Sequence, residues 1–189
     1  MFNNFVSKAI IPVALSLTGF VIICSFILCS SIKEDLLKTA VQQETSLADT
    51  VVSSTRYAMM TDDRENLYHI INSIGAQKGV EHLRIFNKEG VIMFSSKPEE
   101  LNQVVDKTTA GCIECHSGSE PTVHLGSMEL ARRFVNAENH NVLAITSPIY
   151  NDAQCSAGDC HFHPAQQKVL GTLDVGLSTD PLDSSLLAL

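Results

Sequence analysis

Residues 80–96, VEHLRIFNKEGVIMFSS, contain two β-prone runs separated by a short polar segment. The runs VEHLRIF and VIMFSS are rich in Val, Ile and Phe, which are enriched in strands because their side chains pack well on a pleated surface. Between the runs, Asn87-Lys-Glu-Gly90 ends in a glycine, which can adopt the positive φ that such turns need. This stretch therefore predicts a β-hairpin.

Segments on both sides of the hairpin complete an α+β pattern. Residues 62–75, DDRENLYHIINSIG, place apolar side chains on one helical face and predict a helix that starts at a capping box of Asp62 and Glu65. Downstream, NVLAITSPIY at 141–150 and KVLGTLDVGLS at 168–178 predict two further strands. We therefore expect an α+β fold with an antiparallel sheet.

The amino-terminal segment from Ala9 to Ile32 contains no charged side chain and is flanked by Lys8 and Lys33. Its length matches the ~20 apolar residues that a helix needs to cross a bilayer. A cleaved signal peptide is the alternative, but the run is longer than the usual apolar core of such peptides and no A-x-A site closes it. We expect residues 1–32 to be an uncleaved membrane anchor with its amino end inside, surrounded by membrane lipid.

Residues 33–61 contain neither glycine nor proline, and we expect them to continue the anchor as a long membrane-proximal helix. Small and apolar residues recur near heptad spacing along this segment: Leu37, Val41, Ala48, Val51, Thr55 and Ala58. Such spacing is typical of the seam between two helices. It favours a homodimer through residues 33–60.

The composition argues against several classes of function. The chain has 13 Lys and Arg against 21 Asp and Glu, a formal net charge of −8, and no tryptophan. Because nucleic-acid binding needs cationic surface or stacking aromatic side chains, we expect no nucleic acid partner. We also find no grouping of nucleophile, base and orienting residue, so we expect no enzymatic activity.

Four of the six cysteines form two similar motifs, each closed by a histidine: Cys112-Ile-Glu-Cys115-His116 and Cys155-Ser-Ala-Gly-Asp-Cys160-His161. The first has the C-x-x-C-H spacing of c-type haem attachment, in which the thiols bind the haem edge and the histidine binds the iron. The second has a wider spacing with the same residue types. Both motifs fall in long predicted loops, 97–141 and 151–168, and long loops in compact domains usually carry function.

Other chemistries also suit these cysteines. The four thiols could form a zinc site, Cys112 and Cys115 could form a redox dithiol, and either pair could form a disulfide outside the cytoplasm. Cys24 and Cys29 in the apolar segment are interpreted as inert apolar residues. Lipid attachment at Cys29 is disfavoured, because Leu28 stands where a small residue would be needed.

A haem iron accepts a second axial ligand, usually from histidine or methionine. The candidates for this distal position are His163, His140, His124 and Met60, the last together with its neighbour Met59. Two further histidines lie on the outward faces of their predicted elements and are expected to be solvent-exposed: His69 and His82.

The order of RIFNKEGVIMFSS, CIECH, SPIYNDAQCSAGDCHFHP and VLGTLDVGLS resembles the periplasmic haem-c sensor domains, PAS-like or Cache-like in fold, of membrane-bound bacterial histidine kinases and chemoreceptors. The resemblance covers roughly residues 33–179. It implies a covalent haem c at each of the two motifs. The haem irons would be held by His116, next to Cys112 and Cys115, and by His161, next to Cys155 and Cys160.

We therefore expect residues 62–180 to form a periplasmic domain with two haem c groups, followed by a tail at 181–189 that leads toward a second membrane helix. The chain would lie in the inner (cytoplasmic) membrane as a single-pass protein. It would sense redox state or a small ligand and act on a signalling partner. The alternative is a membrane-anchored electron-transfer cytochrome that serves a redox partner.

Overall fold

The computed structural model describes residues 2–106, 108, 112–116, 118, 130–151, 155, 163–164 and 166–187, without the side chains of 2–9, 114, 182 and 185–187. Three residues that the sequence proposed for haem binding lie outside this part: His124, Cys160 and His161.

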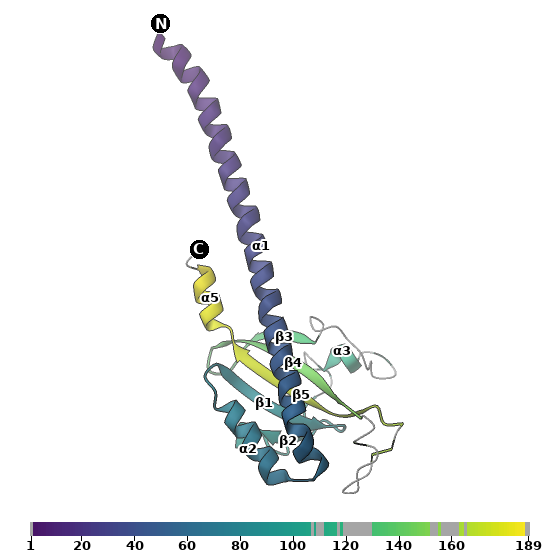
Figure 1. Ribbon diagram of the computed structural model, residues 1–189. Helices are drawn as coiled ribbons and strands as arrows, with labels where there is room; N and C mark the ends of the chain where they lie inside the picture. The colour runs from purple at the N-terminus through teal and green to yellow at the C-terminus, as the bar shows by residue number, and fades with distance from the viewer. Residues whose placement is uncertain are drawn as a thin grey trace.

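The chain begins with one uninterrupted helix, α1 (Phe2–Met60), which contains Pro12 near its amino end. At 1.5 Å per residue this helix is about 89 Å long. Its apolar part is long and hydrophobic enough to cross a membrane and is not buried against the rest of the described protein. Figure 1 shows this part projecting far beyond the sheet. The predicted continuation of the anchor into a long helix is therefore confirmed.

The rest of the domain is built on one five-stranded antiparallel sheet with the strand order β2-β1-β5-β4-β3. The strands are β1 (Val80–Asn87), β2 (Ile92–Ser95), β3 (Ala131–Val135), β4 (Asn141–Tyr150) and β5 (Val169–Ser178). The predicted hairpin forms β1 and β2, and Gly90 in its turn has a φ of +88°. The last strand, β5, lies at the centre between β1 and β4, so the fold depends on pairing between distant segments.

Two helices, the second half of α1 and α2 (Arg64–Gly75), cover one face of the sheet (Figure 1). Because side chains alternate along a strand, the odd-numbered residues of the central strands point to these helices and form the core. Leu83 and Ile85 on β1 meet Leu173 and Val175 on β5 in this cluster. The α+β class that the sequence predicts is therefore correct.

The stripe on α1 that the sequence assigned to a dimer seam packs against the protein's own sheet instead. Of its six residues, five are each at most 2% exposed: Val41, Ala48, Val51, Thr55 and Ala58. Leu37, at the membrane end of the stripe, is only half-buried. Heptad-like spacing describes any helix with one apolar face, whether that face meets a second helix or a sheet. These residues therefore cannot also form the predicted contact with a second copy, and a dimer through residues 33–60 would need another face of the helix.

The start of α2 differs by one residue from the prediction. Asp63, not Asp62, is the N-cap, and its carboxylate accepts a hydrogen bond from the backbone N–H of Asn66 at 3.0 Å. Asp62 instead has a φ of +51°, a left-handed conformation that turns the chain between α1 and α2. The predicted partner Glu65 takes no part in this cap, because the N3 position belongs to Asn66.

Among the described residues, the sequence did not predict four elements, of which two are the short helical turns η1 (Pro98–Glu100) and α3 (Ile113–His116) in the predicted loop 97–141. β3 also lies within the predicted loop 97–141. Its two adjacent arginines, Arg132 and Arg133, break the alternation of apolar and polar residues that predicts a strand. Most of the predicted tail lies in a helix, α5 (Asp180–Leu187). Its first turn contains Asp180 and Asp183, whose negative charges are favourable near the amino end of a helix. Figure 1 shows α5 leaving the sheet on the side from which α1 arrives.

Candidate functional site

A pocket of about 230 Å³ lies at the carboxyl-terminal end of α1. The left-handed turn at Asp62 separates the end of α1 from the start of α2, and the two helices meet the sheet there at the ends of β4 and β1 and the start of β5. Most of the lining is apolar and includes Val52, Leu67, Ile85, Phe94, Ile149 and Leu170.

Three residues that the sequence proposed for haem binding line this one pocket. They are Met60 at the end of α1, the cysteine Cys155, and His163, and Met59 lines it as well. About 100 residues of sequence separate the methionines from the cysteine, and β4 and the turn after α1 bring them together. A thioether, a thiol and an imidazole are the group types that hold a c-type haem and its iron.

The same pocket is also lined by charged groups. Arg56 comes from α1, and Arg64 opens α2, with Asp62 between them in the sequence. The guanidinium carbon of Arg64 lies 5.2 Å from the centre of the Phe94 ring, a cation–π contact that orients the side chain. The pocket therefore combines an apolar lining with two cationic groups.

The first cysteine motif forms a single helical turn, α3 (Ile113–His116). The backbone N–H groups of Cys115 and His116 both donate to the Cys112 carbonyl oxygen, at 3.2 and 3.1 Å. Cys112 and Cys115 are half-buried, while His116 is exposed. This turn brings the two thiols of the motif to neighbouring positions, as attachment to one haem edge requires.

The first cysteine motif lies close enough to the sheet to affect the pKa of two residues on its strands, Tyr150 and Arg132. Burial raises the pKa of Tyr150, and the nearby Cys115 raises it further. Since Tyr150 and Cys155 both line the pocket at the end of α1, Cys115 and Cys155 lie toward the same end of β4. Cys112 in turn acts on Arg132, although burial and Asp174 affect the pKa of that guanidinium more strongly.

The structure does not bring His140 to this region. Its Nδ1 lies 3.0 Å from Glu81 Oε1, and its side chain is half-exposed beside the turn between β3 and β4. β4 starts at Asn141 and reaches the pocket at Tyr150, a distance of about 30 Å at 3.3 Å per residue. His69 is exposed on α2, as predicted.

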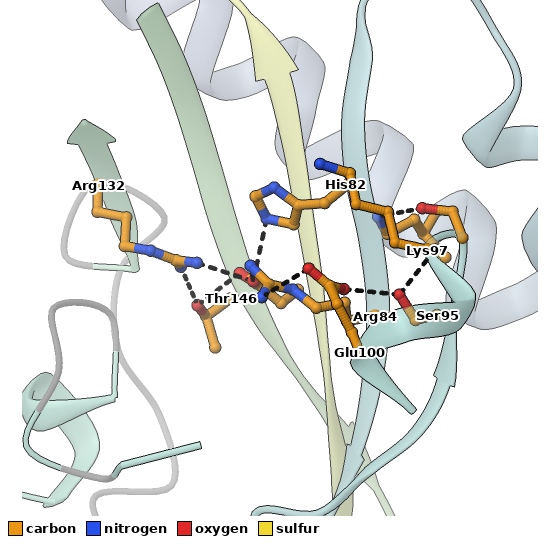
Figure 2. Close-up of polar contacts among 10 residues, drawn as sticks. His82, Arg84, Ser95, Lys97, Glu100, Arg132 and Thr146 are labelled. Carbon is orange, nitrogen blue, oxygen red and sulfur yellow. Dashed lines mark hydrogen bonds and ion pairs between the residues drawn. The ribbon is translucent and has the colours of Figure 1, made fainter. Parts of the chain in front are cut away.

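A second polar cluster lies on the sheet face away from the helices and centres on Asp174 of β5 (Figure 2). Asp174 is 1% exposed, and its Oδ2 lies 2.8 Å from Arg132, 3.0 Å from Arg84 and 3.1 Å from Nε2 of His82. Arg132 also donates to the Thr146 hydroxyl at 2.8 Å. The cluster therefore joins β1, β3, β4 and β5.

Burial by itself would raise the pKa of Asp174, but the hydrogen bond with His82 and the charge of Arg132 outweigh it and hold this pKa well below its usual range. Arg84 also faces Glu100 at 3.6 Å, at the end of the short helix η1 (Pro98–Glu100). Ser95 on β2 donates to the same Glu100 carboxylate at 2.7 Å. The buried charges therefore compensate one another.

The prediction that His82 is solvent-exposed is wrong. Its position away from the helices was inferred correctly from strand alternation, but the residue is only 5% exposed. The ring lies over Gly176, its pairing partner on β5, where an added Cβ would overlap the imidazole. Alternation along a strand shows which face a side chain is on, but not whether that face is covered. The pairing of His82 with a glycine, which leaves room for the ring, was the signal of its burial.

Sequence reasoning also passed over Glu44 on α1. It is fully buried, between Val41 and Ala48 in the stripe that packs on the sheet. The signal was present, because Glu44 occupies the heptad position that its apolar neighbours predict to be internal.

Comparisons with known proteins found one family and several similar solved structures. Residues 33–185 match the family described as Single cache domain 4. Among solved structures, a methyl-accepting chemotaxis protein from Vibrio parahaemolyticus RIMD 2210633 is similar, with 7% identity over 82% of this chain and 99% of that chain and a TM-score of 0.48. The ligand-binding domain of Campylobacter jejuni chemoreceptor Tlp3, in complex with L-valine, has 11% identity over 82% and 66% of the two chains and a TM-score of 0.39. No curated protein matches the chain.

Proposed function

This chain belongs to the single Cache domain 4 family, and we propose that it is the periplasmic input domain of a membrane-anchored signal-transduction protein and carries two c-type haems. α1 would cross the inner membrane, and the sheet domain would lie on the outer side, where haem c is attached. The signal would be the redox state or the axial ligand of a haem iron, passed on to a signalling partner.

The observation that carries this proposal is the meeting of Met60, Cys155 and His163 in one pocket. The lining fits a haem in three respects. Its apolar side chains suit the faces of a porphyrin, the thioether and imidazole are axial ligand types, and the guanidinium groups of Arg56 and Arg64 suit the two propionates. Cys155 would bind covalently together with Cys160, with His161 on the iron.

Bound there, a haem would supply a redox-active iron that can exchange ligands. Met60 or His163 would help to hold this iron when no external ligand is bound. Met60 is the last residue of α1, and Val52 and Arg56 of the same helix line the same pocket. A rearrangement of these side chains would therefore act directly on the helix that leads to the membrane.

The second haem is proposed at Cys112 and Cys115 with His116 on its iron. The turn of α3 supports this, because it places both thiols beside each other and leaves His116 exposed rather than committed to the core. The proximity of Cys115 to Tyr150, which lines the pocket, would put both haems at the same end of the sheet.

The proposal can be tested by counting haems in the full chain, expressed with a cytochrome c maturation system. A pyridine haemochrome assay should find two per chain, and the double substitution Cys112→Ala with Cys115→Ala should leave one. Cys24→Ala with Cys29→Ala is the matched control in the apolar segment and should keep both. Zinc or disulfides at these cysteines, with no covalent porphyrin, would contradict the proposal.

The same preparation separates a sensor from the electron-transfer alternative. If Met60 or His163 is a displaceable ligand, carbon monoxide should shift the Soret band of about one haem in two after reduction. Two haems that ignore carbon monoxide while passing electrons rapidly to a soluble cytochrome would instead support the carrier function.

A further inference from the structure

The interface between α1 and the sheet contains a carboxyl group that packing does not explain. Glu44 is 0% exposed, and its neighbours one turn away on α1 are Ala40, Val41, Leu47 and Ala48. Neither Oε1 nor Oε2 has a hydrogen-bond partner among the described residues. An ionised carboxylate in such surroundings would be very unfavourable, because no hydrogen bond from a described residue replaces the water that it loses on burial.

The groups around Glu44 do not supply that compensation. From β5, Asp174 adds a negative charge, and the backbone N–H of Leu177 adds a favourable dipole. From β3, Arg132 adds a positive charge, but this guanidinium is already paired with Asp174 at 2.8 Å.

In the part of the chain that the structure describes, the remaining elements contribute no charge at this point. The residues of β4, β1 and α2 that enter the core beside α1 are apolar: Leu143, Ile145, Leu83, Ile85, Leu67 and Ile71. His82 and Arg84 of β1 point to the other face of the sheet and bind Asp174 there. Burial therefore dominates and raises the pKa of Glu44 from 4.5 to about 8.

We propose that Glu44 is a proton-binding site that couples the docking of α1 on the sheet to the pH outside the membrane. Docking buries Glu44 and requires that it carry a proton, whereas release of the helix exposes it as a carboxylate. This site is separate from the pocket at the end of α1 and does not depend on haem binding.

The position of Glu44 makes such coupling effective. It lies in the middle of the membrane-proximal half of α1, between the apolar segment and the pocket at Met60. The size of this coupling follows from the difference between the pKa of the exposed and of the buried Glu44 carboxyl. Between these two pKa values, each unit of pH changes the docking equilibrium up to about tenfold. Docking is favoured fully below about 4.5 and weakens as the pH rises to about 8.

Hydrogen exchange of the full chain in detergent micelles tests the proposal. The exchange rates of amides at 41–55 in wild type are divided by those in Glu44→Gln at the same pH, which cancels the intrinsic effect of pH on exchange. The ratio should rise severalfold to about tenfold per pH unit from about pH 5.5 and level off near pH 8. Glu65→Gln, which removes an exposed carboxylate on α2, is the control and should show no such trend.

Two results would overturn the proposal. One is a ratio that does not change with pH. The other is an equal slope for the core amides of β1, because Glu44 would then affect only global unfolding and not the docking of α1. If Glu44→Gln does not fold, the wild-type rates at 41–55, compared with those of β1 across the same pH range, give the same decision.

Discussion

Asp174 and Asp183 allow the stability contribution of a buried ion pair to be compared with that of an exposed one. Asp174 pairs with Arg132 and Asp183 with Arg133, two neighbouring residues of β3. Asp174 is 1% exposed, whereas the side chain of Asp183 is 27% exposed and that of Arg133 is 44% exposed. The substitutions Asp174→Asn and Asp183→Asn therefore make the same chemical change in two environments.

The expected magnitudes differ severalfold. Asp174→Asn leaves the guanidinium groups of Arg84 and Arg132 in the sheet without their shared carboxylate, and breaking a buried pair in this way costs about 3–5 kcal/mol. Glu100 at 3.6 Å from Arg84 compensates in part and favours the lower end. Asp183→Asn breaks an exposed pair and should cost about 1 kcal/mol or less.

Thermal and urea unfolding of the full chain in detergent, followed by circular dichroism, would measure both. For a domain of this size Asp174→Asn should lower Tm by roughly 6–20 °C and Asp183→Asn by only a few degrees. The folded pKa of Asp174 lies below the ordinary 3.8, so its stabilisation is present above that pH and is lost as the pH falls further. The acid-induced loss of stability should accordingly be smaller in Asp174→Asn.

The reasoning would be refuted if the two substitutions changed the free energy of unfolding by equal amounts at neutral pH. It would also fail if wild type and Asp174→Asn lost stability in parallel on acidification.

Glu44→Gln should raise the free energy of unfolding at about pH 7 by up to about 3 kcal/mol, because wild type must take up a proton to fold there. This gain should shrink to nothing near pH 4.5. Urea unfolding of wild type at several pH values would check it, and a wild-type stability that does not fall between pH 4.5 and 8 would contradict the prediction. Gly176→Ala should destabilise by about 1–3 kcal/mol, because the new Cβ displaces the His82 ring. Adding His82→Ala should recover part of that loss in a double-mutant cycle, and no recovery would exclude the ring contact as the cause.

Local signals in the sequence were sufficient for most of the helices and strands, but not for β3 and α5. The glycine at position 90 and the β-prone runs beside it predicted the hairpin, and the absence of glycine and proline from residues 33–61 predicted that the apolar helix continues beyond the anchor. Each of these depends on residues close together in the chain, where backbone preference and side-chain period act directly.

The pocket could not be located from the sequence. Met60 and His140 were both candidate iron ligands, and the sequence did not indicate which of them lies at the pocket. The structure places Met60 in the same pocket as His163, whereas His140 lies at the other end of β4, where it meets Glu81. That difference depends on the strand order, which puts β5 between β1 and β4 and is set by pairing between segments distant in the chain.

Most helix and strand segments, the long apolar stretch of α1 and the residue types that suit haem binding could thus be recognised without the structure. What covers each face became clear only from the packing: the sheet and not a second helix covers the stripe on α1, and His82 is buried at Asp174. The physical reason is that side-chain periodicity states that a face is apolar or polar, whereas burial depends on what packs against it. Glu44 shows this most clearly, since its charge marks it as exposed and its packing against the sheet makes it a buried acid.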